Sequence, residues 1–373
     1  MIESITNHDA FERLGDDWRH LQRHSASRSL FLSWEWLFTW WKHLSAARRL
    51  MILVVRRDEQ ITAIAPFAIR PASATRLLPF RAVELLGTGS VGSDYLDLIV
   101  KRGSEDEAIQ EIVTHLETLG LPLELSQVLL EGSSARRLAD SLAPRGWRVS
   151  TSHENVCPYI TLAGIDWPSY VASLSGAHRT NLRRRIRGLQ QIDSVRFDPV
   201  RSEEECGTAL DGLIAMHNAR RQKLGGSDAF HTRDMVLFHQ EFSRVALRNG
   251  WLRLMVLRVG EAPVAYFYGF RHENVHSFYQ SAFDPAWNAR SVGLVAMGLA
   301  IRSAIEEGAG EFDLLHGAER YKHHWAREER AIGRMDLHPP FLRGRITSGA
   351  AELGRVARGM GRSFLRAGGG PPA

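Results

Sequence analysis

Five side chains that can transfer protons or bind anions crowd into ten positions near the end of the sequence. They surround the end of a short predicted strand that runs from Glu311 to Leu315. Ligands in α/β folds collect where strands end. Tyr321 could serve as a general acid, and His316 or Glu319 as a base acting through water. The alternative is that Tyr321 packs in the core and the charged side chains are solvated. The candidates are Asp313, His316, Glu319, Tyr321 and Lys322.

A second candidate site is a loop-to-helix junction. A predicted strand ends at Phe283, and a very apolar helix begins near Val292. Ser291 has the side chain of an N-cap, and Gly293 would let a ligand approach the backbone. Free N–H groups at a helix start suit a pyrophosphate. An ordinary junction would have the same features. The residues of this candidate anion site are Arg290, Ser291, Val292, Gly293, Leu294 and Val295.

A third candidate is an arginine-rich helix predicted from Arg179 to Gln191. One apolar stripe runs along it at helical spacing. Arg183, Arg184 and Arg187 lie away from that stripe. Such arginines usually form a solvated face, but they could also bind phosphates of a substrate or of a carrier lipid.

The helices and strands that must position these candidates occur in the same order in each half of the chain. Two hairpins are predicted, over 50–69 and 251–270, each with a short polar turn. A strand, an amphipathic helix, a strand and more helix follow each hairpin; they include a strand at 94–100 and a last helix from about Glu319. The pattern predicts mixed sheets with helices on their faces. We expect the halves to meet near Val156–Pro158, so that residues 1–156 and 157–340 form two lobes.

Composition narrows the class of protein. The 373 residues are 44% hydrophobic, which suggests two globular domains. Two isolated cysteines, Cys157 and Cys206, form neither a metal-binding spacing nor a disulfide framework. The longest apolar runs are too short to span a bilayer, and the N-terminus does not resemble a signal peptide. We therefore expect a cytoplasmic protein without a metal.

The net charge of +5 is concentrated in residues 341–373, which hold six arginines and one acid. The rest of the chain is neutral in sum, which argues against a broad nucleic-acid-binding surface. On a helix, four of these arginines would share one face opposite an apolar stripe. This pattern is typical of a basic amphipathic tail on an anionic membrane. The tail could instead pack against the body or bind a soluble anion such as a cyclic dinucleotide.

Together these stretches resemble the CelD/BcsL-like acetyltransferases, a two-lobed branch of the GNAT superfamily related to the Fem-type aminoacyltransferases. The resemblance covers about Phe11 to about Trp325. It implies an α/β (α+β) fold of two tandem GNAT-like lobes, each a mixed, mostly antiparallel sheet flanked by helices. It rests on residues 31–36, 64–67, 179–189, 260–265, 283–293 and 317–325.

The resemblance also implies that acyl-CoA, acetyl or longer, binds in a V-shaped opening between two strands. The family's pyrophosphate loop has the form [Q/R]-x-x-G-x-[G/A]; this chain matches at Arg290 and Gly293 and departs at Val295. Tyr321 falls where GNAT enzymes often keep a tyrosine that protonates the leaving thiolate. The glycine loop at 87–92 precedes a strand instead of a helix, so the N-terminal lobe is expected to be degenerate for CoA.

The implied activity is N-acyl transfer by direct attack of an amine on the thioester. Family members often serve extracellular polysaccharide production, so the expected acceptor is an amino sugar on a nucleotide or lipid carrier. Arg183, Arg184, Arg187 and Lys322 would bind it. Two other readings stay open. A Fem-type transferase would use aminoacyl-tRNA, and a non-catalytic sensor would use the fold only to bind.

Overall fold

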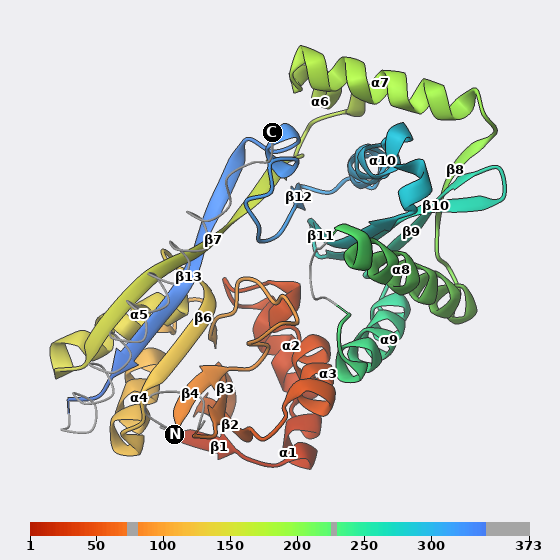
Figure 1. Cartoon of the computed structure of the whole chain (residues 1–373). Helices are drawn as coiled ribbons and strands as arrows, with labels where there is room; N and C mark the ends of the chain where they lie inside the picture. The colour runs from red at the N-terminus through yellow and green to blue at the C-terminus, as the bar shows by residue number, and fades with distance from the viewer. Residues whose placement is uncertain (73–80, 225–229, 341–373) are drawn as a thin grey trace, which may run out of the picture.

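The computed structural model describes residues 1–72, 81–224 and 230–340, so the predicted tail at 341–373 lies outside the described residues. The described chain forms two α/β lobes that share one 13-stranded sheet (Figure 1). Along the sheet the strands run in the order β1-β2-β3-β4-β6-β13-β7-β12-β11-β10-β9-β8, with β5 beside β3. The expectation of a mixed, mostly antiparallel sheet flanked by helices is confirmed.

The N-terminal lobe begins with a buried aromatic layer. Trp18, Trp36 and Trp40 are almost completely buried. Its elements are β1 (Ile2–Ile5), α1 (His8–Arg13), α2 (Gly15–Arg23), η1 (Leu30–Leu32), α3 (Trp34–Leu44), β2 (Arg49–Arg57), β3 (Gln60–Arg70), β4 (Ala82–Leu85), β5 (Ile99–Val100), α4 (Glu105–Leu119), β6 (Leu123–Leu129), α5 (Ser134–Leu142) and η2 (Ala143–Arg145).

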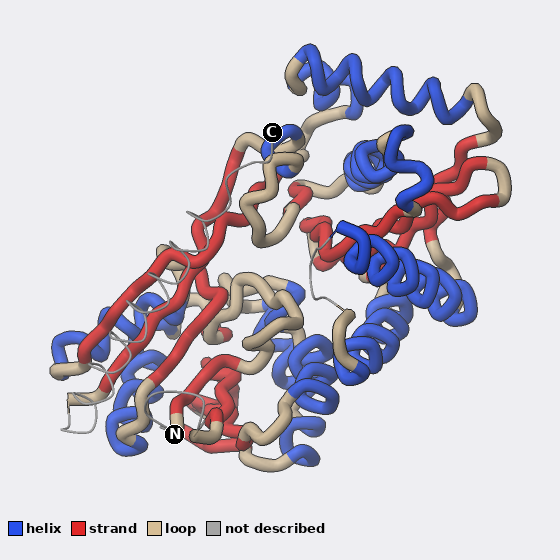
Figure 2. Tube along the Cα trace, viewed as in Figure 1, coloured by secondary structure: helices blue, strands red, loops and turns tan. Residues whose placement is uncertain are grey.

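The C-terminal lobe repeats this order of hairpin, strand, helix and strand. Apolar side chains of α10 pack on one face of its strands, and α8 and α9 cover the other face (Figure 2). Its elements are α6 (Trp167–Ser173), α7 (Gly176–Gln190), β8 (Val195–Pro199), α8 (Glu203–Leu224), α9 (Arg233–Arg248), β9 (Leu252–Val259), β10 (Ala262–His272), β11 (Val275–Phe283), η3 (Pro285–Arg290), α10 (Val292–Glu306), β12 (Glu311–Asp313) and η4 (Lys322–His324).

Two long antiparallel strands join the lobes. β7 (Arg148–Thr161) pairs with β13 (Glu328–His338) along nearly its whole length, and its last residues also pair with β12. β13 in turn pairs with β6 of the N-terminal lobe. The expected boundary near residue 156 therefore lies inside β7, and β13 near the end of the described chain also completes the N-terminal sheet.

Two local expectations are wrong. The strand expected at 94–100 is reduced to β5, because its first residues contact the C-terminal lobe instead of a neighbouring strand. The helix expected from Glu319 is only the short η4. Gly317 has a φ of 131°, and the chain after it turns toward β13 instead of continuing as a helix.

Candidate functional site

The central feature of the C-terminal lobe is a fork between two strands. β11 and β12 run parallel and pair only where Val275–Ser277 faces Glu311–Asp313. β11 continues to Phe283. The chain after Asp313 follows β7 instead, since the N–H of Leu314 donates to the Pro158 carbonyl (2.9 Å) and that of Gly317 to Val156 (3.0 Å). The two strands therefore diverge after this pair, which is the arrangement that a V-shaped opening of the kind implied by the resemblance requires.

A β-bulge at Tyr279 interrupts the regular pairing of β11 beside this fork. The register of β11 against β10 shifts between Tyr268 and Gly269, which leaves Tyr279 as the extra residue. Its hydroxyl donates to the Val91 carbonyl of the N-terminal lobe and lies 3.3 Å from Nε2 of His239. Burial lowers the pKa of His239 to about 3, so this imidazole is neutral. The bulge thus ties the fork to a loop of the other lobe.

The loop at 86–98 of the N-terminal lobe reaches His316 at the fork. Asp94, with no exposed surface, accepts the backbone N–H of His316 at 2.9 Å. Its carboxylate oxygens also lie 2.9 and 3.0 Å from the imidazole Nδ1. The hydrogen bond to Asp94 raises the pKa of His316 above its ordinary value. His316 is therefore oriented, with its Nε2 side left for other partners, by a carboxylate from the opposite lobe.

Asp313 is held by the same loop. The Tyr95 hydroxyl donates to Asp313 at 2.7 Å, and the N–H of Leu315 donates to it at 2.7 Å. Burial raises the pKa of Asp313 to about 7 despite these bonds. Cys157 is buried beside this pair, and burial raises the pKa of its thiol. A carboxyl that titrates near neutrality can accept a proton from an amine.

Backbone strain surrounds these two pairs. Tyr95 and Leu315 both have positive φ, at 58° and 53°. Left-handed conformations of residues other than glycine cost about 1–3 kcal/mol and gather at functional sites. Both residues adjoin an acid–base pair, Tyr95 next to Asp94 and Leu315 next to His316. The strain fits a site whose geometry the surrounding contacts enforce.

Lys322 is buried under the turn that carries His316. Its side chain is 4% exposed, and its ammonium donates to the carbonyls of His316 (2.6 Å) and Leu315 (3.2 Å). It also lies 3.2 Å from the Glu319 carboxylate. A buried ammonium with these acceptors holds the turn that carries His316. We therefore reassign Lys322 from substrate binding to positioning His316.

Tyr321 lies just before η4 and is 43% exposed. It does not pack in the core, so the structural alternative considered for it is wrong. Glu319 is also exposed. The predicted cluster therefore divides into two buried side chains at the fork, Asp313 and Lys322, the half-exposed His316, and the exposed pair Glu319 and Tyr321.

The predicted anion site coincides with the start of α10. Ser291 occupies the N-cap position but has a φ of 55° and caps nothing with its side chain, so the predicted side-chain cap is wrong. N-caps that bond to the helix normally have extended backbone. The first N–H groups of the helix thus lack the usual side-chain acceptor, the first turn holds no acid, and Arg290 is exposed beside it.

Val295, where the chain departs from the family's pyrophosphate loop, belongs to the hydrophobic core. Val295 is fully buried with Leu189 and Val264 on the sheet side of α10. A side chain that faces the sheet does not obstruct the helix start. Gly293 faces the ring of Phe283, because a Cβ built on it would lie 3.2 Å from the nearest ring carbon. A larger residue at 293 would therefore disturb packing as well as a ligand.

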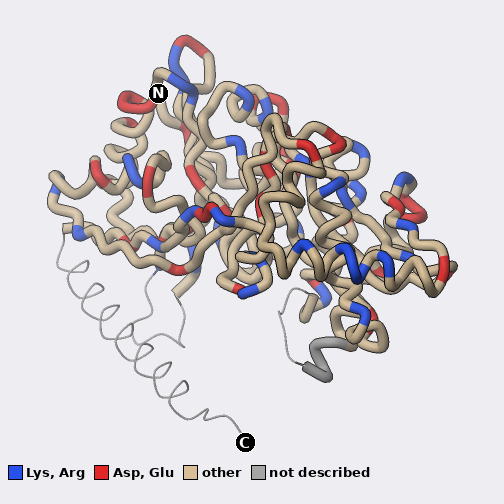
Figure 3. The backbone as a smooth tube through the Cα atoms, turned by 90° about the horizontal axis from the view of Figure 1, so that it is seen from above, with Lys and Arg blue, Asp and Glu red and all other residues tan. Residues whose placement is uncertain are grey.

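The predicted arginine patch lies on α7, which contacts α10 and η3. Arg183, Arg184 and Arg187 are all exposed. Arg185, which the prediction omitted, donates to the Ala289 carbonyl at 2.6 Å and so ties α7 to the loop before α10. Figure 3 shows basic segments recurring along this helix, which has no acidic residue. The patch and the helix start are neighbours in space.

The N-terminal lobe has a corresponding gap between strands and a corresponding helix start. Its own chain occupies the gap, and acidic residues occupy the helix start. β4 and β6 share a single parallel pair, Val83 with Leu123. The gap beyond it holds the lobe's own chain, since the N–H of Leu96 donates to the Gln127 carbonyl at 3.0 Å. The first turn of α4 carries three acids, Glu105, Asp106 and Glu107. Acids at a helix start repel a pyrophosphate, which fits the predicted degeneracy.

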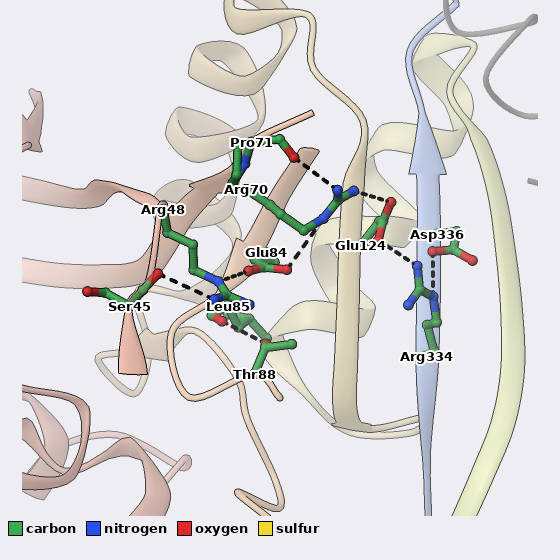
Figure 4. A network of polar contacts seen from close by, with 10 residues as sticks. All are labelled: Ser45, Arg48, Arg70, Pro71, Glu84, Leu85, Thr88, Glu124, Arg334 and Asp336. Atoms are coloured by element: carbon green, nitrogen blue, oxygen red, sulfur yellow. Dashed lines mark hydrogen bonds and ion pairs between the residues drawn. The ribbon is translucent and has the colours of Figure 1, made fainter. Parts of the chain in front are cut away.

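A ladder of alternating charges reinforces the sheet at this weak pairing (Figure 4). Glu84 of β4 contacts Arg48 and lies 3.8 Å from Arg70. Arg70 contacts Glu124 of β6 at 2.8 Å, and Glu124 contacts Arg334 of β13 at 2.8 Å. Glu84 is buried and the others are at most about one-quarter exposed. The ladder joins four strands through side chains where the backbone pairing is shortest.

Comparisons with known proteins agree with this geometry. Residues 176–323 match the model of the acetyltransferase (GNAT) domain. This stretch runs from α7 through η4 and contains the fork, the α10 start and the His316 turn. The C-terminal lobe is thus similar to a GNAT acetyltransferase domain. No curated protein matches the sequence of the chain.

Solved structures match over most of both chains, at low identity. FemX has a TM-score of 0.63 and 10% identity, over 90% of this chain and 96% of that one. The C-terminal domain of a putative lysylphosphatidylglycerol synthetase from Agrobacterium fabrum gives 0.53 and 11%, over 93% and 96%. A tandem GNAT protein from the clavulanic acid biosynthesis pathway gives 0.50 and 10%, over 90% and 98%. These likenesses establish the tandem GNAT fold alone; the CelD/BcsL-like branch stays a prediction.

Residues 1–72, 81–224 and 230–340 contain no group of three His, Cys, Asp or Glu side chains placed to hold a metal ion. Within the same ranges, every helix is too short or too polar to cross a membrane.

Proposed function

We propose that the chain is an acyl-CoA-dependent N-acyltransferase, acetyl-CoA or a longer acyl-CoA being the donor. The observation that carries the proposal is the pairing of an open strand fork with an uncapped, acid-free helix start in the C-terminal lobe. In the N-terminal lobe the corresponding gap holds the lobe's own chain, and the start of α4, although it also lacks a side-chain cap, carries three acids. The proposed acceptor is an amine, in the first instance an amino sugar of an exopolysaccharide or its nucleotide- or lipid-linked precursor.

In this proposal the pyrophosphate of the donor binds the N–H groups of Val292 and Gly293 beside Arg290, since the N–H of Leu294 already donates to the Ser291 carbonyl (3.0 Å), and the thioester enters the fork. The amine attacks the thioester carbon from the face that carries Asp313 and His316. Asp313 or His316 accepts the proton of the amine, and Tyr321 protonates the leaving thiolate. Arg183, Arg184 and Arg187 would bind phosphates of a nucleotide-linked or lipid-linked acceptor.

Charge reversal at the helix start tests the donor site. Arg290→Glu should weaken CoA binding in calorimetry by about 1.4–2.8 kcal/mol, roughly 10- to 100-fold in Kd, because an anion then faces the pyrophosphate. Arg233→Glu is the matched control, since Arg233 is exposed at the start of α9 on the other face of the sheet. Equal CoA affinity in both variants would refute the assignment of the pyrophosphate to α10.

A free-thiol release assay separates the proposed function from its rivals. A transferase releases thiol from acetyl-CoA in the presence of an amine. A non-catalytic sensor binds acetyl-CoA without amine-dependent release. A Fem-type transferase stays an alternative because the chain shares its fold with FemX. Such an enzyme transfers an aminoacyl group from aminoacyl-tRNA and does not need CoA.

An anionic membrane or a cyclic dinucleotide remains the proposed partner of the tail at 341–373.

A further inference from the structure

A cavity of about 350 Å³ lies between the two lobes. The N-terminal lobe contributes the segment 26–32, Tyr95 and Asp97 to its wall, and the C-terminal lobe contributes Ser277 and Asp313. The side chains of Phe278 and Phe312 point into the core beneath α10. Since side chains alternate across a strand, Ser277 and Asp313 face the opposite side. The cavity therefore opens on the face of the sheet away from α10.

The cavity meets the fork at its apex. Ser277 and Asp313 form the last pair between β11 and β12, and both line the cavity. Beyond this pair the strands diverge. If a thioester enters the fork, a molecule in the cavity can approach it from the face away from α10. This step rests on the proposed function.

Carboxylates exceed cations in the cavity wall. Two of the four acids are paired, Glu273 with Arg28 at 3.1 Å and Glu311 with Arg330 at 2.5 Å. Asp97 is bonded to the Ser27 hydroxyl and to N–H groups at the start of α5.

Asp313 is the remaining acid in the wall, and it lies 3.6 Å from Arg330. The other titratable group in the wall, His272, has its pKa lowered by burial and adds no charge near neutrality. Glu273 and Glu311 pair with the two arginines, and burial raises the pKa of Asp97, so the Asp313 carboxylate is the group in the wall that a cationic guest would contact.

We propose that this cavity is the acceptor site and that it takes a small polar primary amine, about the size of one sugar or amino acid, whose ammonium lies against Asp313. The volume is at the lower end of the roughly 300–1,000 Å³ of small-molecule sites. Serine and carboxylate groups in the wall can bond to hydroxyls of such a guest. Any carrier attached to the amine would remain outside the cavity.

The transfer step balances with these groups. The ammonium gives one proton to the Asp313 carboxylate. The nitrogen then forms a bond to the acyl carbon while the carbon–sulfur bond breaks. The nitrogen loses a second proton as it becomes an amide, and the leaving thiolate takes up one proton. Asp313 therefore acts as the base, and the pairing of His316 with Asp94 holds the neighbouring turn.

A plug in the cavity tests the acceptor site. Val275 lies in β11 and lines the cavity, so Val275→Trp fills it without changing its charge, while Val275→Ile serves as the control. The probes are glucosamine, lysine and putrescine as amines, with glucose as the neutral comparison. At least one amine should bind the CoA-saturated protein and support thiol release. Val275→Trp should raise its KM by about tenfold or more, a loss of 1.4 kcal/mol.

A second variant tests the base. Asp313→Asn keeps the shape of the side chain, and it should lower amine-dependent thiol release about 100-fold, as expected for loss of a general base. The rise of wild-type activity with pH near neutrality should be absent from this variant. Melting temperature and CoA affinity, measured for every variant, report on the fold and the donor site.

The outcomes distinguish the two proposals. If CoA binds through Arg290 but no probe amine binds, or if Val275→Trp leaves amine kinetics unchanged, the acceptor cavity is refuted and the proposed function stands. If CoA does not bind at all, the proposed function itself fails. Equal binding of glucose and glucosamine would also refute the ammonium-selective cavity.

Discussion

Replacement of Asp94 by asparagine should uncouple the two lobes in a pH-dependent way. Asp94 of the N-terminal lobe is fully buried and bonds both the backbone N–H and the imidazole of His316 in the C-terminal lobe. Asparagine keeps the size of the side chain and one acceptor oxygen. It removes the charge that stabilises the protonated imidazole.

The magnitude follows from the geometry. A hydrogen bond to a charged group contributes about 1.5–3 kcal/mol to stability. The His316 side chain is 36% exposed, so solvent screens the interaction and the lower end, about 1.5 kcal/mol, applies. The pKa of His316 is raised in the folded state. The contribution is therefore complete below the unfolded pKa of about 6.5 and is lost as the pH rises through the higher folded value.

Urea unfolding of the wild type and of Asp94→Asn measures this difference at about pH 5.5 and about pH 8.5, on either side of the ordinary histidine pKa. The variant should be less stable by about 1.5 kcal/mol at the lower pH, and by less at the higher pH. Asp16→Asn, which removes an exposed carboxylate paired with Arg19, is the control and should show no such pH dependence. An equal loss at both values would mean that Asp94 acts through shape alone, and the ion-pair reasoning would be wrong.

Two further predictions concern the general acid that protonates the leaving thiolate, and the tail at 341–373. Tyr321→Phe should reduce turnover about 100-fold at unchanged CoA affinity if the hydroxyl is the acid; a decrease of only a few-fold would refute this role. Deletion of residues 341–373 should abolish sedimentation with anionic vesicles, because each arginine near such a surface contributes about 1 kcal/mol, and should leave turnover on a soluble amine intact. Lost turnover with unchanged vesicle binding would exclude recruitment by the tail.

Local patterns in the sequence were sufficient for most elements of the fold. The sequence predicts the hairpins β2–β3 and β9–β10 and the helices α7 and α10, because apolar periodicity and turn residues act over a few positions. The junction at Arg290–Val295 was recognised for the same reason. The left-handed backbone of Ser291 and the burial of Val295 could not be predicted in this way, because they depend on how α10 packs on the sheet.

The loop at 86–98 shows where local reasoning failed. Its apolar residues predict a strand, and its glycines precede a predicted strand instead of a helix. Its partners are His316, Asp313 and Tyr279, which lie more than 180 positions away in the chain. No periodicity in the sequence marks a contact of that separation. The cluster of three glycines at 87, 89 and 92, all with positive φ, was the available signal.

The sequence by itself determined the two-lobed α/β architecture, the helix start suited to an anion and the crowding of titratable residues at 313–322. Tertiary structure decided which of these residues are available. It buried Lys322 against carbonyls, left Tyr321 exposed, and placed Asp94 and Tyr95 of one lobe on His316 and Asp313 of the other. The reason is that side-chain type is local, whereas burial and charge pairing depend on segments that only the folded sheet brings together.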